Sequence, residues 1–372
     1  MITLEAEFID HRKIDSAFLA EWEGLWLNSQ SHSLNSQAAM VSLTIEHDWK
    51  HSDCKLVVVR DFESRLVALL PIALDRDRFL GLRARTLGNP RSPASQMLLS
   101  NDVDAEHVWQ AVIKTLSRSQ VQLFDFDWCN LNSPHVKSLI QCCDQSQLVY
   151  HQKSRFQVAT IQLPNSAESL ESSLSKNFRK KLRGWSRRLA CDGELSLRMY
   201  DHRDHGTEYL RGLSEMNEIE ASSWKADAGT AISTGCNDYE YWQRWMQIAR
   251  DAKCLRLWVL YSGYRPIAFD MGAQVGQTYS SHKISYLNDL REFAPGHVRD
   301  HLVFQKMIEE KQIHSIDTIG PATESTLRWP HQNRNVGRIQ VAVGSWASRS
   351  VVNAYAGLSQ LKAFFQNHSF GG

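Results

Sequence analysis

The sequence lacks a net charge, a long apolar run and the composition of a fibrous or disordered protein. Its 372 residues include 42 Lys and Arg against 41 Asp and Glu, so the formal net charge is +1. An overall electrostatic attraction to nucleic acid or to an anionic membrane is therefore excluded, and any polyanion site must be local. No stretch approaches the about 18 apolar residues of a membrane span, and no signal peptide is predicted because the first residues lack an apolar core.

Cysteine pairs and common catalytic motifs are also missing. The seven cysteines are an odd number without C-x-x-C spacing, and Cys142 and Cys143 are adjacent. We therefore expect reduced thiols in a cytoplasmic protein. The patterns G-x-S-x-G, G-x-x-x-x-G-K-[ST], G-x-G-x-x-G and H-E-x-x-H do not occur. The fifteen histidines form one loose cluster, HRDH (202–205), which has no second cluster to join it, so no metal site is predicted.

What the sequence does contain is one order of elements that recurs in its two halves. The length predicts two or three domains of about 150 residues each. Apolar periodicity predicts, in each half, a strand, two helices, a three-strand antiparallel run, a helix, a strand, a short helix and a last strand. This order is typical of an α+β or mixed α/β layer design. The N-terminal half has predicted strands at 3–10, 56–60, 66–75, 121–128 and 155–163, and predicted helices at 14–28, 35–50, 105–119 and 134–146. The C-terminal half has predicted strands at 194–201, 255–263, 265–276, 277–287, 314–320 and 337–344, and predicted helices at 207–223, 238–252 and 296–311.

A basic segment, residues 164–193, joins the two halves. Its residues 169–189 are predicted to form a helix, in which Phe178, Leu182, Trp185 and Leu189 make a buried stripe. Residues 176–188 carry seven basic side chains and no acidic one. Three interpretations stay open: a solvated helical face, a site for the phosphates of CoA or a polyanionic acceptor, and a site for nucleic acid such as tRNA.

The most informative stretch is ISYLNDLREFAPGHVRDHLVFQKM (284–307), where a strand, a loop and a long helix follow one another. Free N–H groups and the dipole at a helix start favour phosphate. Pro295 fixes the loop, Gly296 allows close approach of a ligand, and His297 and Arg299 could add positive charge. The alternative is that Pro295-Gly296 is only a turn that opens a helix.

These segments, taken together, resemble a known family. The element order is similar to the GNAT acetyltransferase fold, and residues 170–330 resemble the GNAT-like domain of bacterial proteins associated with cellulose and exopolysaccharide biosynthesis. Those proteins are related to the Fem-type aminoacyl ligases, which have two GNAT-like halves joined by a basic helical segment. The matching residues are KNFRKKLRGWSRRL (176–189), EIEASSWK (218–225), Tyr286 with APG (294–296), IDTIG (316–320) and the pair Arg328-Trp329. Residues 1–163 match by element order alone.

The resemblance implies two tandem GNAT-like lobes, residues 1–163 and 194–372, with 164–193 as connector. It implies an acyl-CoA donor, such as acetyl-CoA, whose diphosphate is held by the loop before the third helix of the C-terminal lobe: Ala294, Pro295, Gly296, His297 and Arg299. The acceptor would lie in the cleft between the lobes, near Trp224, Lys225, Tyr286 and Arg328, and is expected to be a sugar or polysaccharide precursor. Two positions depart from the family: Leu287 replaces an acid, and Leu327 replaces a lysine.

Direct acyl transfer requires a base for the acceptor and a donor for the oxyanion, and it needs no catalytic cysteine. By resemblance, the backbone of the strand at 277–287 is the oxyanion donor. The candidate bases are His282 on that strand, Asp270 on the preceding strand and Glu220 on the first helix of the lobe. His282 is chosen first because histidine titrates closest to neutrality. Burial of Asp270 in its apolar strand would raise its pKa and suit it to proton exchange.

We therefore predict an acyl-CoA-dependent N- or O-acyltransferase that acts by direct transfer. Two rival functions stay open. One is an aminoacyl transferase that uses charged tRNA, as the Fem-type relatives do. The other is a non-catalytic binding protein of a polysaccharide system, which the departures at Leu287 and Leu327 favour.

Overall fold

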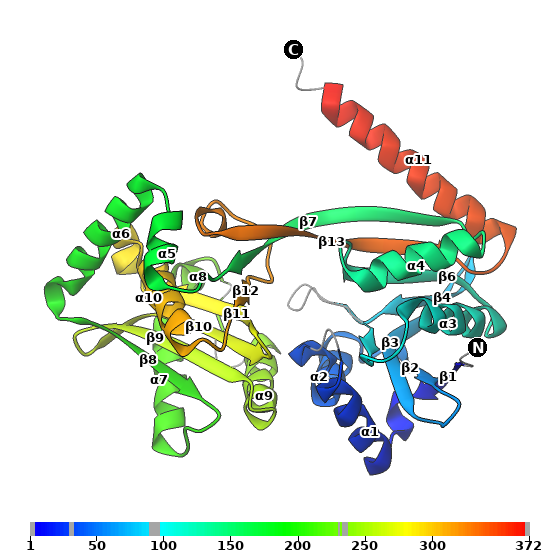
Figure 1. Cartoon of the computed structure of the whole chain (residues 1–372), viewed down its shortest axis with the longest axis horizontal. Helices are drawn as coiled ribbons and strands as arrows, with labels where there is room; N and C mark the ends of the chain where they lie inside the picture. The colour runs from blue at the N-terminus through cyan, green and yellow to red at the C-terminus, as the bar shows by residue number, and fades with distance from the viewer. Residues whose placement is uncertain (1–3, 30–32, 89–96, 230, 233–236, 369–372) are drawn as a thin grey trace. The chain divides into compact units, whose positions relative to one another are not determined.

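The chain divides into two compact units, and two strands continue from one unit into the other. The structure is a computed structural model, and it describes residues 4–29, 33–88, 97–229, 231–232 and 237–368 (Figure 1). Unit 1 comprises residues 1–156 and 334–372, and unit 2 comprises residues 157–333. Strands β7 (Tyr150–Gln162) and β13 (His331–Ala342) each run from one unit into the other. The division into lobes 1–163 and 194–372, with 164–193 as connector, stays a prediction.

Unit 1 is a mostly antiparallel sheet with strand order β1-β2-β3-β4-β6-β13-β7, to which β5 is added beside β3. Strands β4 and β6 pair in parallel, whereas β6 and β13 pair antiparallel. The C-terminal part of the chain thus supplies a strand to the sheet that the N-terminal part builds. The elements are β1 (Glu5–Asp10), α1 (Ser16–Leu27), α2 (Ala38–Asp48), β2 (Asp53–Arg60), β3 (Leu66–Asp77), β4 (Gly81–Thr86), β5 (Leu98–Leu99), α3 (Ala105–Arg118), β6 (Val121–Asn130), α4 (Pro134–Gln145) and α11 (Trp346–His368).

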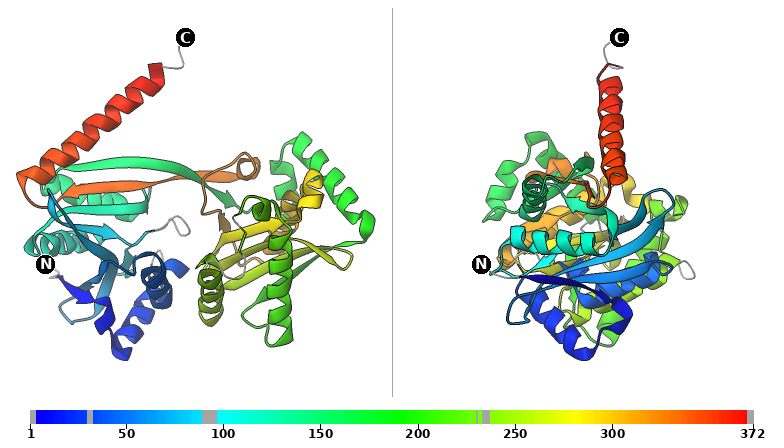
Figure 2. Two further views of the ribbon diagram at one scale, coloured as in Figure 1. Left: turned by 180° about the vertical axis from the view of Figure 1, so that it is seen from behind. Right: turned by 90° about the vertical axis from the view of Figure 1, so that its right-hand side faces the viewer.

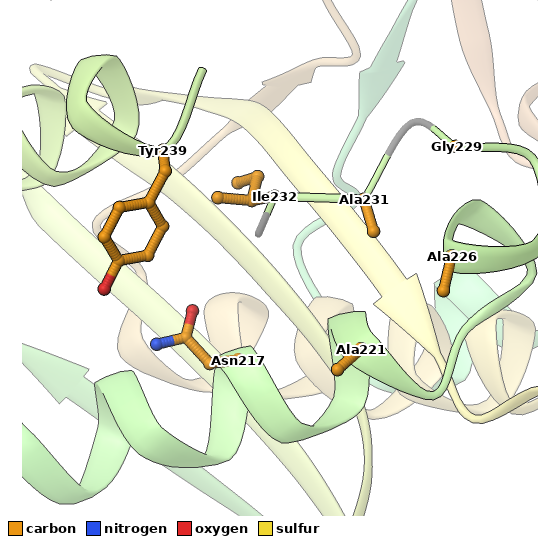
Figure 3. A pocket seen from close by; sticks show the side chains of 7 residues that line it. All are labelled: Asn217, Ala221, Ala226, Gly229, Ala231, Ile232 and Tyr239. Carbon is orange, nitrogen blue, oxygen red and sulfur yellow. The ribbon is translucent and has the colours of Figure 1, made fainter. Parts of the chain in front are cut away.

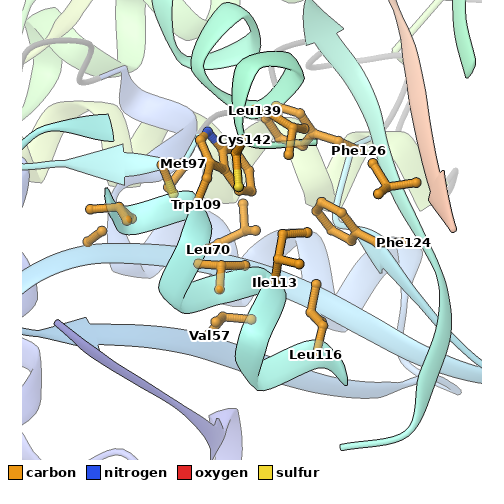
Figure 4. Packing of buried hydrophobic residues seen from close by; sticks show 14 of the residues in the cluster. Val57, Leu70, Met97, Trp109, Ile113, Leu116, Phe124, Phe126, Leu139 and Cys142 are labelled. Atoms are coloured by element: carbon orange, nitrogen blue, oxygen red, sulfur yellow. The ribbon is translucent and has the colours of Figure 1, made fainter. Parts of the chain in front are cut away.

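Helices α3 and α4 cover one face of the unit 1 sheet. Asp104 caps α3 by accepting a hydrogen bond from the Glu106 N–H, and one face of the helix is apolar. That face packs on the inward side chains of β6 and on α4, as Figure 4 shows for Trp109, Phe124 and Leu139. Helix α11 covers the opposite face near Val352 and then extends away from the unit 1 sheet (Figure 2).

Unit 2 is a second mostly antiparallel sheet, with strand order β7-β12-β11-β10-β9-β8. Strands β11 and β12 pair in parallel, whereas β10 pairs antiparallel with both of its neighbours. The end of β7 pairs antiparallel with β12 and completes this sheet. The elements are α5 (Ala167–Ser173), α6 (Lys176–Leu189), β8 (Leu195–Asp201), α7 (Thr207–Ala221), α8 (Trp224–Asp227), α9 (Asn237–Asp251), β9 (Leu255–Ser262), β10 (Arg265–Val275), β11 (Thr278–Tyr286), α10 (Pro295–Glu310) and β12 (Ser315–Asp317).

The two faces of the unit 2 sheet are covered by different helices. Side chains alternate along a strand, so Trp258 and Tyr261 of β9 point to opposite faces. Trp258 packs in the apolar cluster of α10, α5 and α6, whereas Tyr261 hydrogen-bonds to Glu215 of α7. Helix α9 lies on the α7 face, where its Trp242 ring contacts Lys283 of β11. We call these the α10 face and the α7 face.

The fold class is confirmed, because both units are mixed, largely antiparallel sheets flanked by helices. The single helix predicted over 169–189 is wrong: α5 ends at Ser173, and a new helix begins after Ser175. The Ser175 hydroxyl accepts a hydrogen bond from the Phe178 N–H at 3.3 Å and caps α6. The predicted stripe of α6 is buried at Phe178, Leu182 and Leu189.

Helix α11, the cysteines and the lengths of the helices can also be compared with the sequence predictions. Helix α11 had no counterpart among the predicted elements. The six cysteines that the structure describes form no disulfide with one another, and Cys236 lies outside the described residues. No helix in the described part of the chain has the length and apolar character needed to cross a bilayer.

Candidate active site

The central feature of unit 2 is an open edge along β11. This strand pairs with β12 over three residues only, Thr278–Ser280, and then continues to Tyr286. Beyond Ser280, β10 is its one sheet neighbour among the described strands. The Leu287 N–H donates to the Ile267 carbonyl, so the alternation of an antiparallel pair turns the N–H and C=O groups of Ile284 and Tyr286 away from β10. The edge therefore presents backbone groups that the sheet does not use. At its end an isolated antiparallel bridge joins Leu287 to Ser223, where the Asn288 N–H donates to the Ser222 carbonyl at 3.0 Å.

A β-bulge interrupts this edge. Met271 of β10 lies opposite Lys283, and Gly272 lies opposite Ser281, so His282 has no partner in the register. Gly272 is required there, because a Cβ at this position would lie 2.2 Å from the Ser280 carbonyl oxygen. A bulge of this kind redirects a side chain out of the regular alternation.

A buried carboxylate with two lysines lies beside the open edge on the α7 face. Glu220 of α7 is 1% exposed, and its Oε1 atom lies 3.2 Å from Lys283 Nζ and 3.6 Å from Lys225 Nζ. The Ile232 N–H donates to the same oxygen at 3.4 Å. The second oxygen, Oε2, has no hydrogen-bond partner among the described residues. A buried carboxylate oxygen without a donor is costly unless a ligand group uses it.

Lys225 connects this carboxylate to the open edge. Its ammonium group donates to the Ile284 carbonyl at 2.5 Å, on the side of β11 that faces away from β10. Burial lowers the pKa of Lys225 to about 8, although Glu220 opposes the shift. The ammonium group also lies 5.8 Å from the ring of Trp224, which is 42% exposed. Lys225 can therefore exchange a proton close to neutral pH.

His282 lies on the same face but in an apolar setting. Its ring is 4.5 Å from the Trp245 ring and 6.5 Å from the Trp242 ring, both on α9. Burial lowers the pKa of His282 to about 4, with Asp317 opposing the shift. The expectation that this histidine titrates near neutrality is therefore wrong. His282 is neutral at pH 7, and its Nδ1 atom has no hydrogen-bond partner among the described residues.

A pocket of about 380 Å³ opens next to Glu220, between α7, α8 and α9 (Figure 3). Its walls are small and apolar except for Asn217 and Tyr239, whose polar ends point into it. Ile232, which lines the pocket, is the residue whose N–H binds Glu220. The lining residues are Asn217, Ala221, Ala226, Gly229, Ala231, Ile232 and Tyr239. A small molecule in this pocket would lie close to the buried carboxylate.

Asp270 lies apart from this group, on the α10 face. Its Oδ1 atom accepts hydrogen bonds from the Tyr279 hydroxyl and the Ser281 hydroxyl, both at 2.8 Å. Burial raises the pKa of Asp270 to about 6, against the nearby Arg299 guanidinium. The raised pKa agrees with the expectation from its apolar strand. Its partners nevertheless make Asp270 the centre of a buried hydrogen-bond network.

The start of α10 is more occupied than the sequence predicts. Ala294 has a left-handed backbone, and Pro295 opens the helix. The N–H groups of His297 and Val298 both donate to the Ala294 carbonyl, so the Gly296 N–H is the one left without an acceptor among the described residues. A Cβ at Gly296 would lie 3.5 Å from the Tyr286 ring. A phosphate here would find one main-chain donor rather than several.

His297 and Arg299 point into the protein rather than toward a ligand. The His297 ring stacks on Trp185 at 5.7 Å and lies 5.2 Å from Phe178, and burial lowers its pKa. Arg299 is 2% exposed and donates to the Phe269 carbonyl at 2.6 Å. Both residues pack the start of α10 in place.

Arg328 lines a different cavity, of about 730 Å³, on the side of α6 and the segment before β13. Its guanidinium group pairs with Glu324 and lies 5.6 Å from the Phe178 ring. Lys181 and Trp329 line the same cavity. Aromatic rings and cations together suit a polar ligand with an anionic group.

The predicted residues thus form three groups. Glu220, Trp224, Lys225 and His282 meet on the α7 face of the open edge. Tyr286 and residues 294–297 meet at the start of α10, with Arg328 near His297. Asp270 and Arg299 form the buried network. No group of three or more His, Cys, Asp or Glu side chains in the described part of the chain is arranged to hold a metal ion.

Sequence reasoning missed Lys283, which completes the Glu220 cluster, and the Trp242–Trp245 pair that surrounds His282. In a regular strand, the neighbouring side chains of His282 and Lys283 would point to opposite faces. The sequence could therefore not place Lys283 near His282 unless the bulge was known. The aromatic residues were visible as a helical stripe on α9 but were indistinguishable from ordinary core positions.

Part of the chain matches a known protein family. Residues 176–325 match the model of the acetyltransferase (GNAT) domain family. The matched segment includes every predicted site residue except Arg328. No curated protein matches the sequence.

Three solved structures are similar to nearly the whole chain. FemX is 10% identical over 90% of this chain and 96% of its own, with a TM-score of 0.58. A conserved protein of unknown function from Bacteroides thetaiotaomicron is 12% identical over 92% of this chain and 99% of its own, with a TM-score of 0.55. The C-terminal domain of a putative lysylphosphatidylglycerol synthetase from Agrobacterium fabrum is 12% identical over 91% of this chain and 95% of its own, with a TM-score of 0.52. At these identities the likeness concerns the fold alone.

The resemblance inferred from the sequence is therefore confirmed for the GNAT domain and for the similarity of fold to FemX. The narrower link to cellulose and exopolysaccharide biosynthesis stays a prediction.

Proposed function

We propose that the chain is an acyl-CoA-dependent N- or O-acyltransferase that transfers the acyl group directly to a small amine or hydroxyl acceptor, such as a sugar or a polysaccharide precursor. The observation that carries this proposal is the open edge of β11, with the buried Glu220 carboxylate and Lys225 beside it. The GNAT domain match over residues 176–325 supports the reaction class. The acceptor class rests on the sequence resemblance.

The donor would lie along the open edge. The N–H groups of Ile284 and Tyr286, which face away from β10, can donate to the carbonyl groups of an extended pantetheine chain, as they would to an added strand. The Ile284 carbonyl already accepts from Lys225. The Gly296 N–H, at the start of α10, offers one donor to a phosphate oxygen. Arg188, whose guanidinium group lies 5.9 Å from the Phe293 ring, and Arg328 supply positive charge in this region.

Glu220 is proposed as the general base. It takes the proton from the acceptor amine or hydroxyl while the acceptor atom forms its bond to the acyl carbon. The carbonyl oxygen, which gains negative charge, is stabilised by N–H donors of the open edge and by the Lys225 ammonium group. The bond from carbon to sulfur then breaks, and Lys225 gives its proton to the leaving sulfur. The pKa of Lys225, about 8, is close to that of a thiol, so this transfer needs little driving force.

A direct assay tests the proposal. Purified protein is mixed with acetyl-CoA and a panel of amino sugars and simple amines, and released thiol is measured with a chromogenic disulfide. Glu220→Gln should lower kcat/KM by about 100-fold or more, because a positioned base contributes at least that factor. The matched control is Glu292→Gln, at an exposed position in the 3-10 helix Asn288–Phe293 that precedes α10, which should keep full activity.

Binding is tested separately from turnover. Acetyl-CoA at 100 times its dissociation constant should raise the free energy of unfolding by about 2.7 kcal/mol. An unchanged melting temperature in millimolar acetyl-CoA would contradict the acyl-CoA proposal and leave the protein as a non-catalytic member of the fold. A folded Glu220→Gln variant with full activity would remove Glu220 from the mechanism.

A second candidate function, transfer of an aminoacyl group from charged tRNA, is favoured by one observation. Helix α6 exposes six of its seven basic side chains on one outer surface, over the buried stripe at Phe178, Leu182 and Leu189. If those side chains contact tRNA phosphates, the logarithm of the binding constant should fall by about 0.7 to 0.9 for each contact per tenfold increase in salt. A gel-retardation series with tRNA across salt measures that slope. No retardation at low salt would exclude tRNA as the donor.

A further inference from the structure

Unit 1 contains a small basic pocket that the proposed acyltransferase site, in unit 2, does not use. The pocket has a volume of about 180 Å³ and lies on the face of the unit 1 sheet opposite the α3–α4 core. Five of its six lining residues come from alternate positions of two strands, which places their side chains on one face. They are His151, Lys153 and Arg155 of β7, Arg338 and Gln340 of β13, and Tyr355 of α11.

One carboxylate is buried beneath this pocket. Asp127 of β6 has a side chain that is 5% exposed, and it accepts hydrogen bonds from Arg155 at 2.7 Å and from Arg338 at 2.7 Å. Burial opposes ionisation of Asp127, but the two guanidinium groups outweigh it and lower its pKa. Asp127 is therefore negatively charged at neutral pH, and it compensates one of the two arginines.

The charges around the pocket do not balance. Lys153 is exposed and has no ion-pair partner among the described residues. The neighbouring carboxylate, Asp125, is compensated by Arg83. Burial and the nearby Lys153 lower the pKa of His151, so this ring stays neutral. Lys153, Arg155 and Arg338 against Asp127 leave an excess of two positive charges.

The guanidinium group of Arg338 also has an unused donor. Its Nη2 atom is engaged with Asp127, but its Nε atom is buried and has no hydrogen-bond partner among the described residues. A buried donor without an acceptor is unfavourable by about 1 to 3 kcal/mol, and a ligand oxygen in the pocket would satisfy it. Gln340, which is 5% exposed, adds an amide at the floor.

We propose that this pocket binds a phosphoryl group, either as inorganic phosphate or as the head of a phosphate monoester. A phosphoryl group carries close to two negative charges at neutral pH, which matches the excess of positive charge. Its oxygens accept from several directions, as donors on β7, β13 and α11 require. A carboxylate carries one charge and would leave one cation uncompensated.

The test uses the full-length chain, with phosphorus NMR and calorimetry of inorganic phosphate, phenyl phosphate and acetate at one ionic strength. Inorganic phosphate should bind, and acetate should not compete. Lys153→Gln should weaken phosphate binding about tenfold, since a charge-assisted hydrogen bond contributes about 1.5 kcal/mol. Lys137→Gln, at an exposed position on α4, has the same charge change and should bind as the native chain does.

The two phosphate arms distinguish the source of the ligand. Equal binding of phenyl phosphate supports a phosphorylated molecule, and binding of inorganic phosphate alone supports the free ion. Arg338→Lys keeps the charge but removes the planar fork, and it should weaken binding further than Lys153→Gln does. If Arg338→Lys does not fold, the comparison of Lys153→Gln with Lys137→Gln still tests the phosphate site. Absence of binding, equal competition by acetate, or equal loss in Lys153→Gln and Lys137→Gln would overturn the proposal.

Discussion

Each unit contains one pair of parallel strands, β4 with β6 in unit 1 and β11 with β12 in unit 2, and the two pairs end differently. In unit 1, β4 pairs with β6 from Leu82 to Arg85 and ends at Thr86. The Thr86 hydroxyl accepts from the Asp127 N–H at 2.9 Å and donates to the Asp127 carbonyl at 3.1 Å, which joins the strands to the end of β4. In unit 2, β11 pairs with β12 over three residues and then continues without a strand partner on that side to Tyr286, after which Leu287 forms an isolated bridge with Ser223.

The β4–β6 pair of unit 1 is thus closed, whereas β11 of unit 2 has an open edge, although both units follow a similar order of elements. A strand that keeps its partner has no backbone groups left for a ligand, whereas the continuation of β11 offers the N–H groups of Ile284 and Tyr286. The buried Glu220 and Lys225 lie beside the open edge of unit 2. The open edge is therefore the reason that the proposed chemistry belongs to unit 2. Substitutions on either strand pair can perturb this difference.

The largest expected effect is at the bulge where β11 leaves its regular register. Gly272→Ala places a Cβ 2.2 Å from the Ser280 carbonyl oxygen and 2.6 Å from the Tyr279 ring. Backbone cannot yield as a flexible side chain does, so the free energy of unfolding should fall by about 3 kcal/mol or more. Urea denaturation measures the change.

Gly184→Ala, on α6, is the matched control. A Cβ there meets nothing within 4 Å, and alanine in a helix is more favourable than glycine by about 0.5 to 1 kcal/mol. The control should be at least as stable as the native chain. A Gly272→Ala variant with native stability would show that the bulge can relax, and that its geometry is not fixed by this contact.

The sequence predicts the local elements of the fold, because apolar periodicity reports on single helices and strands and not on how distant strands pair. Apolar patterns located the helices at α3, α4, α7, α9 and α10 and the three-strand run β9–β11. They could not predict the exchange of β7 and β13, because pairing between distant strands leaves no local signal. They also missed the break at Ser175, where the apolar spacing of α5 and α6 continues across a cap, and helix α11.

The site was predictable to a smaller degree, because roles depend on which face a side chain meets. Motif resemblance pointed to Glu220, Lys225 and His282, which meet on the α7 face. The sequence could not show that a bulge sends Lys283 to that face, or that Asp270 lies on the other one. It also assigned His297 and Arg299 to a phosphate, although aromatic packing and a backbone carbonyl occupy them.

The second prediction concerns Asp270, whose pKa is raised to about 6. Its pKa in the unfolded chain is about 4, so the folded state binds a proton more tightly and the contribution of Asp270 to stability is lost as pH rises through 6. Asp270→Asn keeps an acceptor for Tyr279 and Ser281 but cannot ionise. Its stability relative to the native chain should improve by about 2 kcal/mol between pH 4 and pH 7.

Chemical denaturation at both pH values gives this difference, and Asp289→Asn, at an exposed position, measures the effect of losing a surface carboxylate. Asp270→Asn also separates a buried network from a catalytic base. Activity retained in a stable variant would assign Asp270 to the network, and activity lost with stability intact would return it to the mechanism.

The third prediction opens the closed pair of unit 1. Thr86→Val keeps the shape of the side chain but removes the hydroxyl that binds both backbone groups of Asp127. The buried N–H then lacks an acceptor, so the free energy of unfolding should fall by about 1 to 2 kcal/mol. Thr115→Val, which removes one hydrogen bond to the Ala6 carbonyl, should have a smaller effect. Equal losses in the two variants would mean that Thr86 does not close the strand pair.

The smallest expected effect concerns Lys225, on the open side of the comparison. Burial lowers its pKa to about 8 from the ordinary value of 10.5. Between these values the unfolded chain holds the proton and the folded chain releases it, so the native protein should gain stability as pH rises. Relative to Lys225→Met, the gain should be about 1 kcal/mol between pH 7.5 and pH 9. The exposed Lys50→Met supplies the correction for removing a surface charge. A constant difference across this range would mean that Lys225 is not desolvated, and the proton transfer proposed for it would then lose its physical basis.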